Sequence, residues 1–146
     1  MTNRPIEILL VEDNEDDILI IQEVFSDVKL ATIINFVRDG EEALAYLRRT
    51  GKFKVARTPD LVLLDINMPK KNGFEVLEEI KTDVKLQSMP VVMLTMSHRE
   101  EDVVRSYGKG ACSYIQKRLD LDQFKQIVQQ FERYWTGVAK LPVTNE

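Results

Sequence analysis

The amino-acid sequence predicts an α/β protein whose core is a doubly wound, five-stranded parallel sheet. Short apolar runs alternate along the chain with segments of helical spacing, and most of the runs are nearly continuous. Continuous runs are typical of strands buried on both faces, and the alternation favours a parallel sheet with right-handed crossovers. We expect strands at Ile6–Val11, Thr32–Val37, Leu61–Leu64, Val91–Thr95 and Cys112–Ile115.

Between these runs, apolar residues recur at the spacing of an α-helix. The first three stripes are Ile18, Ile21, Val24, Phe25 and Val28; then Ala43, Leu44 and Leu47; then Phe74, Val76, Leu77 and Ile80. A fourth helix is expected from about Arg99 to Tyr107, ended by Gly108 or Gly110. We expect a last helix from about Asp120 to Val138, with apolar positions at Phe124, Ile127, Val128, Phe131 and Trp135.

Length and composition indicate one globular domain. The chain has 146 residues, of which 44% are apolar and 30% charged. We expect a single domain over 1–146, with a core of about 5–138 and a frayed tail at 139–146. No apolar run approaches the ~20 residues of a membrane span, and no secretory signal is evident. A single Cys fits a reducing cytoplasm, and the net charge of −4 argues against nucleic acid as a partner.

Polar side chains follow several of the expected strands. Glu12 and Asp13 come directly after the first strand, and Asp65 comes directly after the third. Because parallel sheets bind ligands at the carboxyl ends of their strands, we expect these acids to meet there. A hydroxyl and an ammonium group should approach the same edge, from Thr95 and Lys117.

Three neighbouring carboxylates repel one another unless a cation lies between them. Mg²⁺ prefers oxygen ligands, and the sequence has no Cys/His cluster that would favour zinc. A carboxylate beside Mg²⁺, with a lysine and a hydroxyl opposite, suits phosphoryl transfer, in which the aspartate can be the acceptor. The sequence therefore predicts a magnesium-dependent phosphoryl site.

Four stretches carry a resemblance to a known family. They are Ile8–Asp13 (ILLVED), Leu63–Gly73 (LLDINMPKKNG), Val91–Thr95 (VVMLT) and Tyr114–Lys117 (YIQK). In this order and spacing, the chain resembles the response regulator receiver domain of two-component signalling. The resemblance covers nearly the whole chain, and it implies a flavodoxin-like sheet of order 2-1-3-4-5 with five surrounding helices.

The resemblance also implies a role for each site residue. Asp65 would accept a phosphoryl group from a phosphohistidine of a sensor histidine kinase, which makes the protein a phosphoacceptor rather than an enzyme with a separate substrate. Glu12, Asp13, Asp65 and the main-chain carbonyl of Asn67 would hold Mg²⁺. Lys117 would contact the phosphoryl oxygens, Thr95 would move to hydrogen-bond them, and Tyr114 would swing inward in step. We expect the signal to leave through protein contacts, on the face of the fourth helix, fifth strand and last helix.

Within the family, the chain looks most similar to small single-domain regulators paired with cyanobacterial phytochromes. The features are SHREEDV after Thr95, a long basic insert before the third strand, and FERYW near the C-terminus. This likeness implies a phytochrome-type kinase and a downstream protein target. Three positions depart from the commonest family pattern: Glu12 replaces Asp, Met96 replaces a small residue, and Arg118 replaces a Pro.

Other sequence features have structural readings. Glu15, Asp16 and Asp17 suit the first turn of a helix, where acids interact favourably with the helix dipole. The basic run Arg48–Arg57 is expected to be a solvated loop, and Cys112 a buried apolar residue. The last helix is longer than the strands of the sheet, so its aromatic end is expected to extend beyond them. We expect this end to pair with a second copy in a homodimer, through Phe131, Tyr134 and Trp135.

Three other functions are weighed against the phosphoacceptor. A small-molecule phosphatase would need a second acid two residues after Asp65, where Asn67 stands. A flavin-binding module would need a phosphate loop after the first strand, where five acids stand instead. A degenerate receiver that acts only as an interaction module would lack the site residues Asp65, Thr95 and Lys117.

Overall fold

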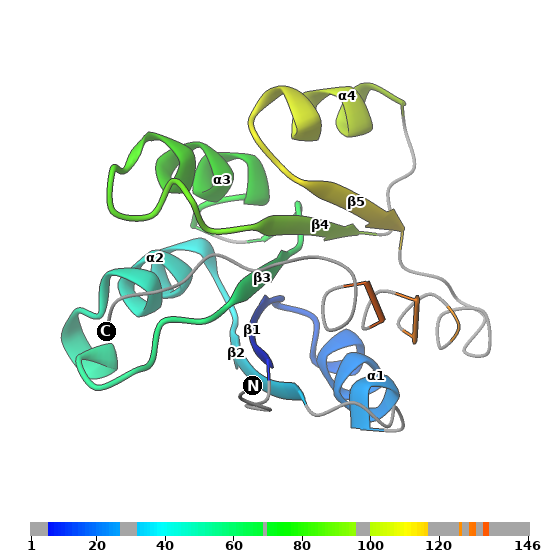
Figure 1. Ribbon diagram of the computed structural model, residues 1–146, viewed down its shortest axis with the longest axis horizontal. Helices are drawn as coiled ribbons and strands as arrows, with labels where there is room; N and C mark the ends of the chain where they lie inside the picture. The colour runs from blue at the N-terminus through cyan, green and yellow to red at the C-terminus, as the bar shows by residue number, and fades with distance from the viewer. Residues whose placement is uncertain are drawn as a thin grey trace.

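The computed structural model describes residues 6–26, 32–68, 70–95 and 100–116, with 126, 129–130 and 133–134. Five parallel strands form one sheet in the order β2-β1-β3-β4-β5, as Figure 1 shows. This confirms the fold class that the sequence pattern predicts and the strand order that the family resemblance implies. The strands are β1 (Ile6–Val11), β2 (Thr32–Val37), β3 (Leu61–Leu64), β4 (Val91–Thr95) and β5 (Ser113–Gln116).

Four α-helices and one short 3₁₀ turn connect the strands within the described residues. They are α1 (Glu15–Ser26), α2 (Gly40–Arg48), the turn Gly51–Phe53, α3 (Gly73–Thr82) and α4 (Glu100–Gly108). The predicted last helix lies mostly outside the described residues, so it stays a prediction.

The fifth strand begins one residue later than expected. The N–H of Cys112 donates to the carbonyl of Val91 at 2.9 Å, and β5 itself starts at Ser113. The expectation that Cys112 is buried is wrong, because its side chain is exposed. Cys112 comes directly before β5, which is an edge strand in the described sheet. An edge strand has a neighbouring strand on one side only, so its residues are less covered.

Two apolar layers enclose the sheet. Along β1, Leu9 and Val11 face the layer shared with α2 and α3, while Ile8 and Leu10 face the layer shared with α1. Figure 1 shows α1 on one side of the sheet and α2 and α3 on the other. Burial on both faces explains why the strand sequences are continuous apolar runs.

Side-chain caps set where the helices begin, and thereby shape the loops at the carboxyl edge of the sheet. Asn14 Oδ1 accepts from the N–H of Asp17 at 3.0 Å at the start of α1. Asp39 Oδ1 accepts from the N–H of Glu42 at 2.8 Å at the start of α2. Asn72 and Glu75 form a reciprocal capping box at α3.

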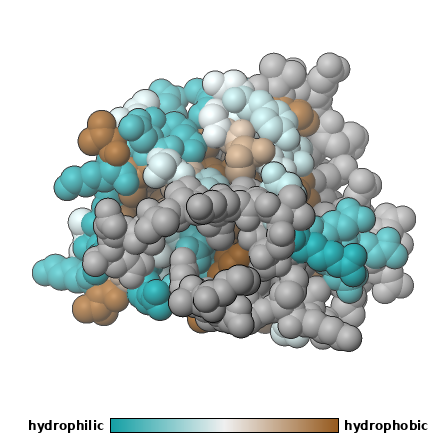
Figure 2. Space-filling view, viewed as in Figure 1, coloured by the Kyte–Doolittle hydropathy of each residue, from teal (hydrophilic) through white to brown (hydrophobic). Residues whose placement is uncertain are grey.

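The described surface in the view of Figure 2 is mainly hydrophilic, and apolar side chains appear as small separate patches. The most exposed large apolar residues are Val55 and Val84, at 91% and 80%. Scattered apolar residues of this kind are ordinary on protein surfaces. Within the described residues, no helix combines the length and the apolar character that crossing a membrane requires.

Candidate acidic site at the carboxyl edge of the sheet

The first two acids of the site follow β1 directly. The N–H of Glu12 donates to the carbonyl of Val37 at 3.0 Å, which extends the β1–β2 pairing by one residue. The Glu12 side chain is buried, at 1% exposure, and its Oε2 accepts from the N–H of Asn14 at 3.2 Å. Asp13 is exposed. The turn into α1 therefore holds one carboxylate inside and leaves the next open to solvent.

Asp65 reaches the same edge from β3. Its N–H donates to the carbonyl of Val11 at 3.0 Å, so the backbone of Asp65 lies beside the end of β1. The Asp65 side chain is buried, at 7% exposure. Adjacent parallel strands that end at the same level thus deliver Glu12 and Asp65 side by side.

The three predicted acids come together in space. One carboxylate oxygen each from Glu12, Asp13 and Asp65 can be chosen so that all three lie within 4.8 Å of one another. An all-oxygen donor set of this charge fits a hard divalent cation. Because Asp13 is exposed, the cluster is reachable from solvent. The residues present therefore fit the Mg²⁺ that the sequence predicts.

The loop after Asp65 is held close to the strand end by a glycine. The N–H of Gly73 donates to the carbonyl of Ile66 at 2.7 Å. A Cβ on Gly73 would lie 2.8 Å from the Ile66 Cα and nearer still to the Asp65 carbonyl oxygen. Sequence reasoning counted Gly73 as part of a motif but missed this contact, whose signal was the glycine at the start of a helix. Asn67 is exposed in the same loop.

The remaining predicted site residues are described only in part. Thr95 is the last residue of β4 and pairs with Gln116 of β5. Tyr114 lies opposite Met93 and is half-buried against the core layer of α2 and α3. Lys117 lies outside the described residues, as do Met96 and Arg118. The roles of Thr95, Tyr114 and Lys117 stay predictions.

The cations of the basic run before β3 are exposed, as expected, and three of them form surface ion pairs. Arg57 Nε lies 3.3 Å from Glu7 Oε2, and Lys52 Nζ lies 2.8 Å from Glu42 Oε2. The hydrogen bond from Lys52 lowers the pKa of Glu42 below its ordinary value. Arg48 pairs with acids of α3, as described below. The segment is therefore solvated, and its cations also pair with neighbouring acids.

Comparison with known proteins agrees with the fold and the acidic cluster. The response regulator receiver domain family matches residues 8–129 of the chain. The protein belongs to this family, and it is therefore a phosphoacceptor protein of two-component signalling. Receiver domains bind a divalent cation, which agrees with the donor set of the carboxylate cluster.

Relatives of this chain include regulators of cyanobacterial phytochromes. The chain is 40% identical over 141 residues to the response regulator Rcp1 of Synechocystis sp., covering 97% of this chain and 96% of that one. The phosphorylated cyanobacterial phytochrome response regulator RcpA has a crystal structure that matches with a TM-score of 0.89 at 46% identity, over 96% of this chain and 100% of that one. The Mn²⁺-bound form of Rcp1 matches with a TM-score of 0.87 at 40% identity, over 95% and 100%.

Proposed function

We propose that this protein is a single-domain response regulator that accepts a phosphoryl group on Asp65 from a sensor histidine kinase of the phytochrome type. The observation that carries the proposal is the meeting of Glu12, Asp13 and Asp65 at the carboxyl edge of a receiver sheet. The relatives Rcp1 and RcpA support the phytochrome link. The action of such a regulator takes place in the cytoplasm, as the single Cys suggests.

In the proposed reaction, a carboxylate oxygen of Asp65 attacks the phosphorus of a phosphohistidine on the kinase. An O–P bond forms, the N–P bond breaks, and its electron pair returns to the histidine nitrogen. The product is an acyl phosphate on Asp65. Burial of Asp65 beside the end of β1 fixes its carboxylate in one place, which lowers the entropic barrier to the in-line attack.

The acids beside Asp65 would hold the cation that this reaction needs. Glu12, Asp13, Asp65 and the main-chain carbonyl of Asn67 are the proposed ligands. A bound Mg²⁺ offsets negative charge on the phosphoryl oxygens. Lys117 would add positive charge on the other side of the phosphoryl group, and Thr95 would donate a hydrogen bond to it.

The output of the proposed regulator is a protein contact. α4 and β5 lie together at one end of the sheet, with Thr95 at the end of neighbouring β4 (Figure 1). Tyr107 of α4 is 49% exposed, and Tyr114 of β5 is half-buried. Phosphorylation would shift a two-state equilibrium of this face and so alter its affinity for a downstream protein.

A homodimer through the C-terminal aromatic residues is also proposed. Tyr134 is 51% exposed, which suits a contact residue, whereas Phe131 and Trp135 lie outside the described residues. Light scattering of the wild type and Trp135→Ala tests this part. A dimer that Trp135→Ala weakens is expected, and a wild-type monomer at tens of micromolar contradicts it.

Acetyl phosphate and Mg²⁺ test the central proposal without a partner kinase. After incubation, intact mass should show one added phosphoryl group on the wild type and none on Asp65→Asn. Asp16→Asn is the matched control, because Asp16 is an exposed acid in the first turn of α1. A chelator should block the gain. No gain in the folded wild type would favour the interaction module that works without phosphorylation.

A further inference from the structure

The amino end of α2 packs directly on the loop that leads from Asp65 to α3. A Cβ placed on Gly40 would lie 2.6 Å from the Lys71 Cβ and 2.7 Å from the Val76 Cγ2, and nearer still to the Lys71 carbonyl oxygen. Two of these three atoms belong to the backbone or the first side-chain carbon of Lys71, so they cannot move without moving the loop. A side chain at position 40 therefore displaces the segment that begins at Asp65.

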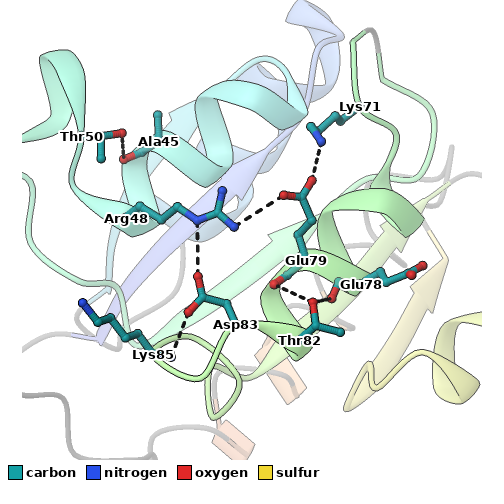
Figure 3. A network of polar contacts seen from close by, with 9 residues as sticks. All are labelled: Ala45, Arg48, Thr50, Lys71, Glu78, Glu79, Thr82, Asp83 and Lys85. Carbon is teal, nitrogen blue, oxygen red and sulfur yellow. Dashed lines mark hydrogen bonds and ion pairs between the residues drawn. The ribbon is translucent and has the colours of Figure 1, made fainter.

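Charged contacts hold the same loop from two further directions. The side chain of Lys71 pairs with Glu79 of α3, and Glu79 Oε1 lies 3.5 Å from Arg48 Nη2 at the end of α2, as Figure 3 shows. Lys70 Nζ lies 3.6 Å from Oδ2 of Asp39, the residue before Gly40. Both ends of α2 are thus tied to the two lysines of this loop.

The backbone of the loop needs such support. Lys70 has a φ of 66°, the left-handed conformation that residues with a Cβ adopt rarely. Conformations of this kind persist where surrounding contacts hold them, and they concentrate at functional sites. At the other end of the loop, Gly73 is pressed against the Asp65 carbonyl. The path between Asp65 and α3 is therefore set by contacts on both sides.

We propose that Gly40 is a positioning residue for the phosphoacceptor site. By allowing α2 to touch the Lys71 main chain, it fixes the loop that carries Asn67 and so the geometry of the cation ligands around Asp65. The proposal rests on the function proposed above. Gly40 touches none of the three acids in the cluster, and its effect passes through the Lys71 backbone and the loop.

Gly40→Ala separates this role from ordinary helix propensity. Gly40 is the first residue of α2, where Ala is a better helix former than Gly and would be expected to stabilise the helix. The close contact with Lys71 predicts the opposite. Gly108→Ala is the matched control, because Gly108 is also a helical residue and a Cβ there meets nothing within 4 Å.

The measurement is the affinity for Mn²⁺ alone, from the electron paramagnetic resonance signal of free Mn²⁺, beside the rate of phosphorylation by acetyl phosphate. For Gly40→Ala we expect both to fall on the order of tenfold, at the lower end of what disturbing the groups around a metal site costs. Gly108→Ala should match the wild type. A folded Gly40→Ala with both values within about twofold of the wild type, a shift below half a kcal/mol, overturns the proposal.

Even if Gly40→Ala does not fold, Lys71→Met tests whether the position of this loop governs the cation site, which the proposal requires. Removing the positive charge of Lys71 reduces its repulsion of Mn²⁺, and by this effect alone Mn²⁺ binding would become tighter. Loss of the Lys71–Glu79 link loosens the loop, however, and should weaken Mn²⁺ binding. Weaker Mn²⁺ binding supports the step from loop to cation site on which the role of Gly40 depends, and unchanged or tighter binding contradicts the proposal. If the wild type itself neither binds Mn²⁺ nor gains phosphate, the proposed function fails; if the wild type does both and the variants match it, the positioning role alone fails.

Discussion

The same two strands carry acids at both of their ends, and the two ends are built differently. At the amino end, the Glu7 N–H donates to Asp60 Oδ2 at 2.9 Å, and the Asp60 N–H donates to the Glu7 carbonyl at 2.7 Å. Arg57 supplies a cation at 3.3 Å from the Glu7 carboxylate. At the carboxyl end, the side chains of Glu12 and Asp65 are joined by a third acid, Asp13.

Buried acids are thus no sign of function by themselves. Glu7 and Asp60 are as buried as Glu12 and Asp65, yet Asp60 accepts from a backbone N–H and Glu7 pairs with an arginine, contacts that suit a structural role. The functional end differs because three carboxylate oxygens converge and because one of the acids, Asp13, is exposed. Convergence with access to solvent, rather than burial, distinguishes the proposed cation site.

The largest expected difference between the two ends is the response to Mg²⁺. At a concentration of about 100 times its Kd, Mg²⁺ should raise the free energy of unfolding of the wild type by about 2.7 kcal/mol. Asp13→Asn should lose most of this gain, whereas Asp60→Asn at the other end should keep it. Chemical denaturation with and without Mg²⁺ measures both. An equal gain in all three proteins would show that the cation binds elsewhere.

Substitutions at the amino end should lower the free energy of unfolding and leave phosphorylation unchanged. Asp60→Ala removes the acceptor of the buried Glu7 N–H, and leaving such a group unsatisfied costs about 1–3 kcal/mol. Asp60→Asn retains an acceptor oxygen and should lose less. Phosphorylation by acetyl phosphate should continue in both variants at temperatures where they are folded. If Asp60→Ala lost phosphorylation while folded, the two ends would be coupled rather than separate.

Removing a charge at the carboxyl end should raise the free energy of unfolding when no cation is present, whereas Asp60→Ala at the amino end lowers it. In a chelator, Asp65→Asn removes one of three like charges, and we expect a gain on the order of 1 kcal/mol in the free energy of unfolding. In excess Mg²⁺, the wild type should become the more stable protein, because it binds the cation more tightly. Thermal unfolding in the two buffers provides the comparison. A destabilised Asp65→Asn in chelator would mean that the acids do not repel one another.

The smallest change in the free energy of unfolding is expected for the partly exposed ion pair between Lys71 and Glu79. This pair serves as a reference for the buried acids at both ends of the strands. The hydrogen bond from Lys71 lowers the pKa of Glu79 below its ordinary 4.5, so the link stabilises the protein above about pH 4.5 and is lost as the pH falls through the lowered pKa. Glu79→Gln should lose about 0.5 kcal/mol at pH 7 and less at pH 3, which lies below the ordinary pKa. Glu23→Gln on α1 is the control, and an equal loss at both pH values would exclude the ion pair.

Much of this fold could be predicted because its strands are buried on both faces. The run Leu61–Leu64 is apolar throughout, and Ile6–Val11 is apolar except at Glu7. Both form strands with the expected bounds. The meeting of Glu12, Asp13 and Asp65 followed from the rule that parallel strands end at one edge. Local pattern and general topology were sufficient for both.

Other features depend on how helices pack, which no local pattern encodes. The contact between Gly40 and Lys71 and the pairing of Arg48 with Glu79 need the relative placement of α2 and α3. Cys112 was misjudged because burial at a sheet edge depends on neighbours that its own segment does not reveal. The functional edge was therefore predictable in its acids and not in the loop contacts that hold them.

The alignment of β1 with β3 has a consequence for how the protein folds. It places Ile8 opposite Leu61 and Val11 opposite Leu64. Glu7 and Asp60 are 53 residues apart in sequence, the same separation as Glu12 and Asp65. A slip by one residue would turn a strand's side chains to the opposite faces and would undo both acid pairs together. The Glu7–Asp60 pair at the amino end and the acidic cluster at the carboxyl end therefore depend on the same alignment of β1 with β3, and both form only when this long-range strand pairing forms.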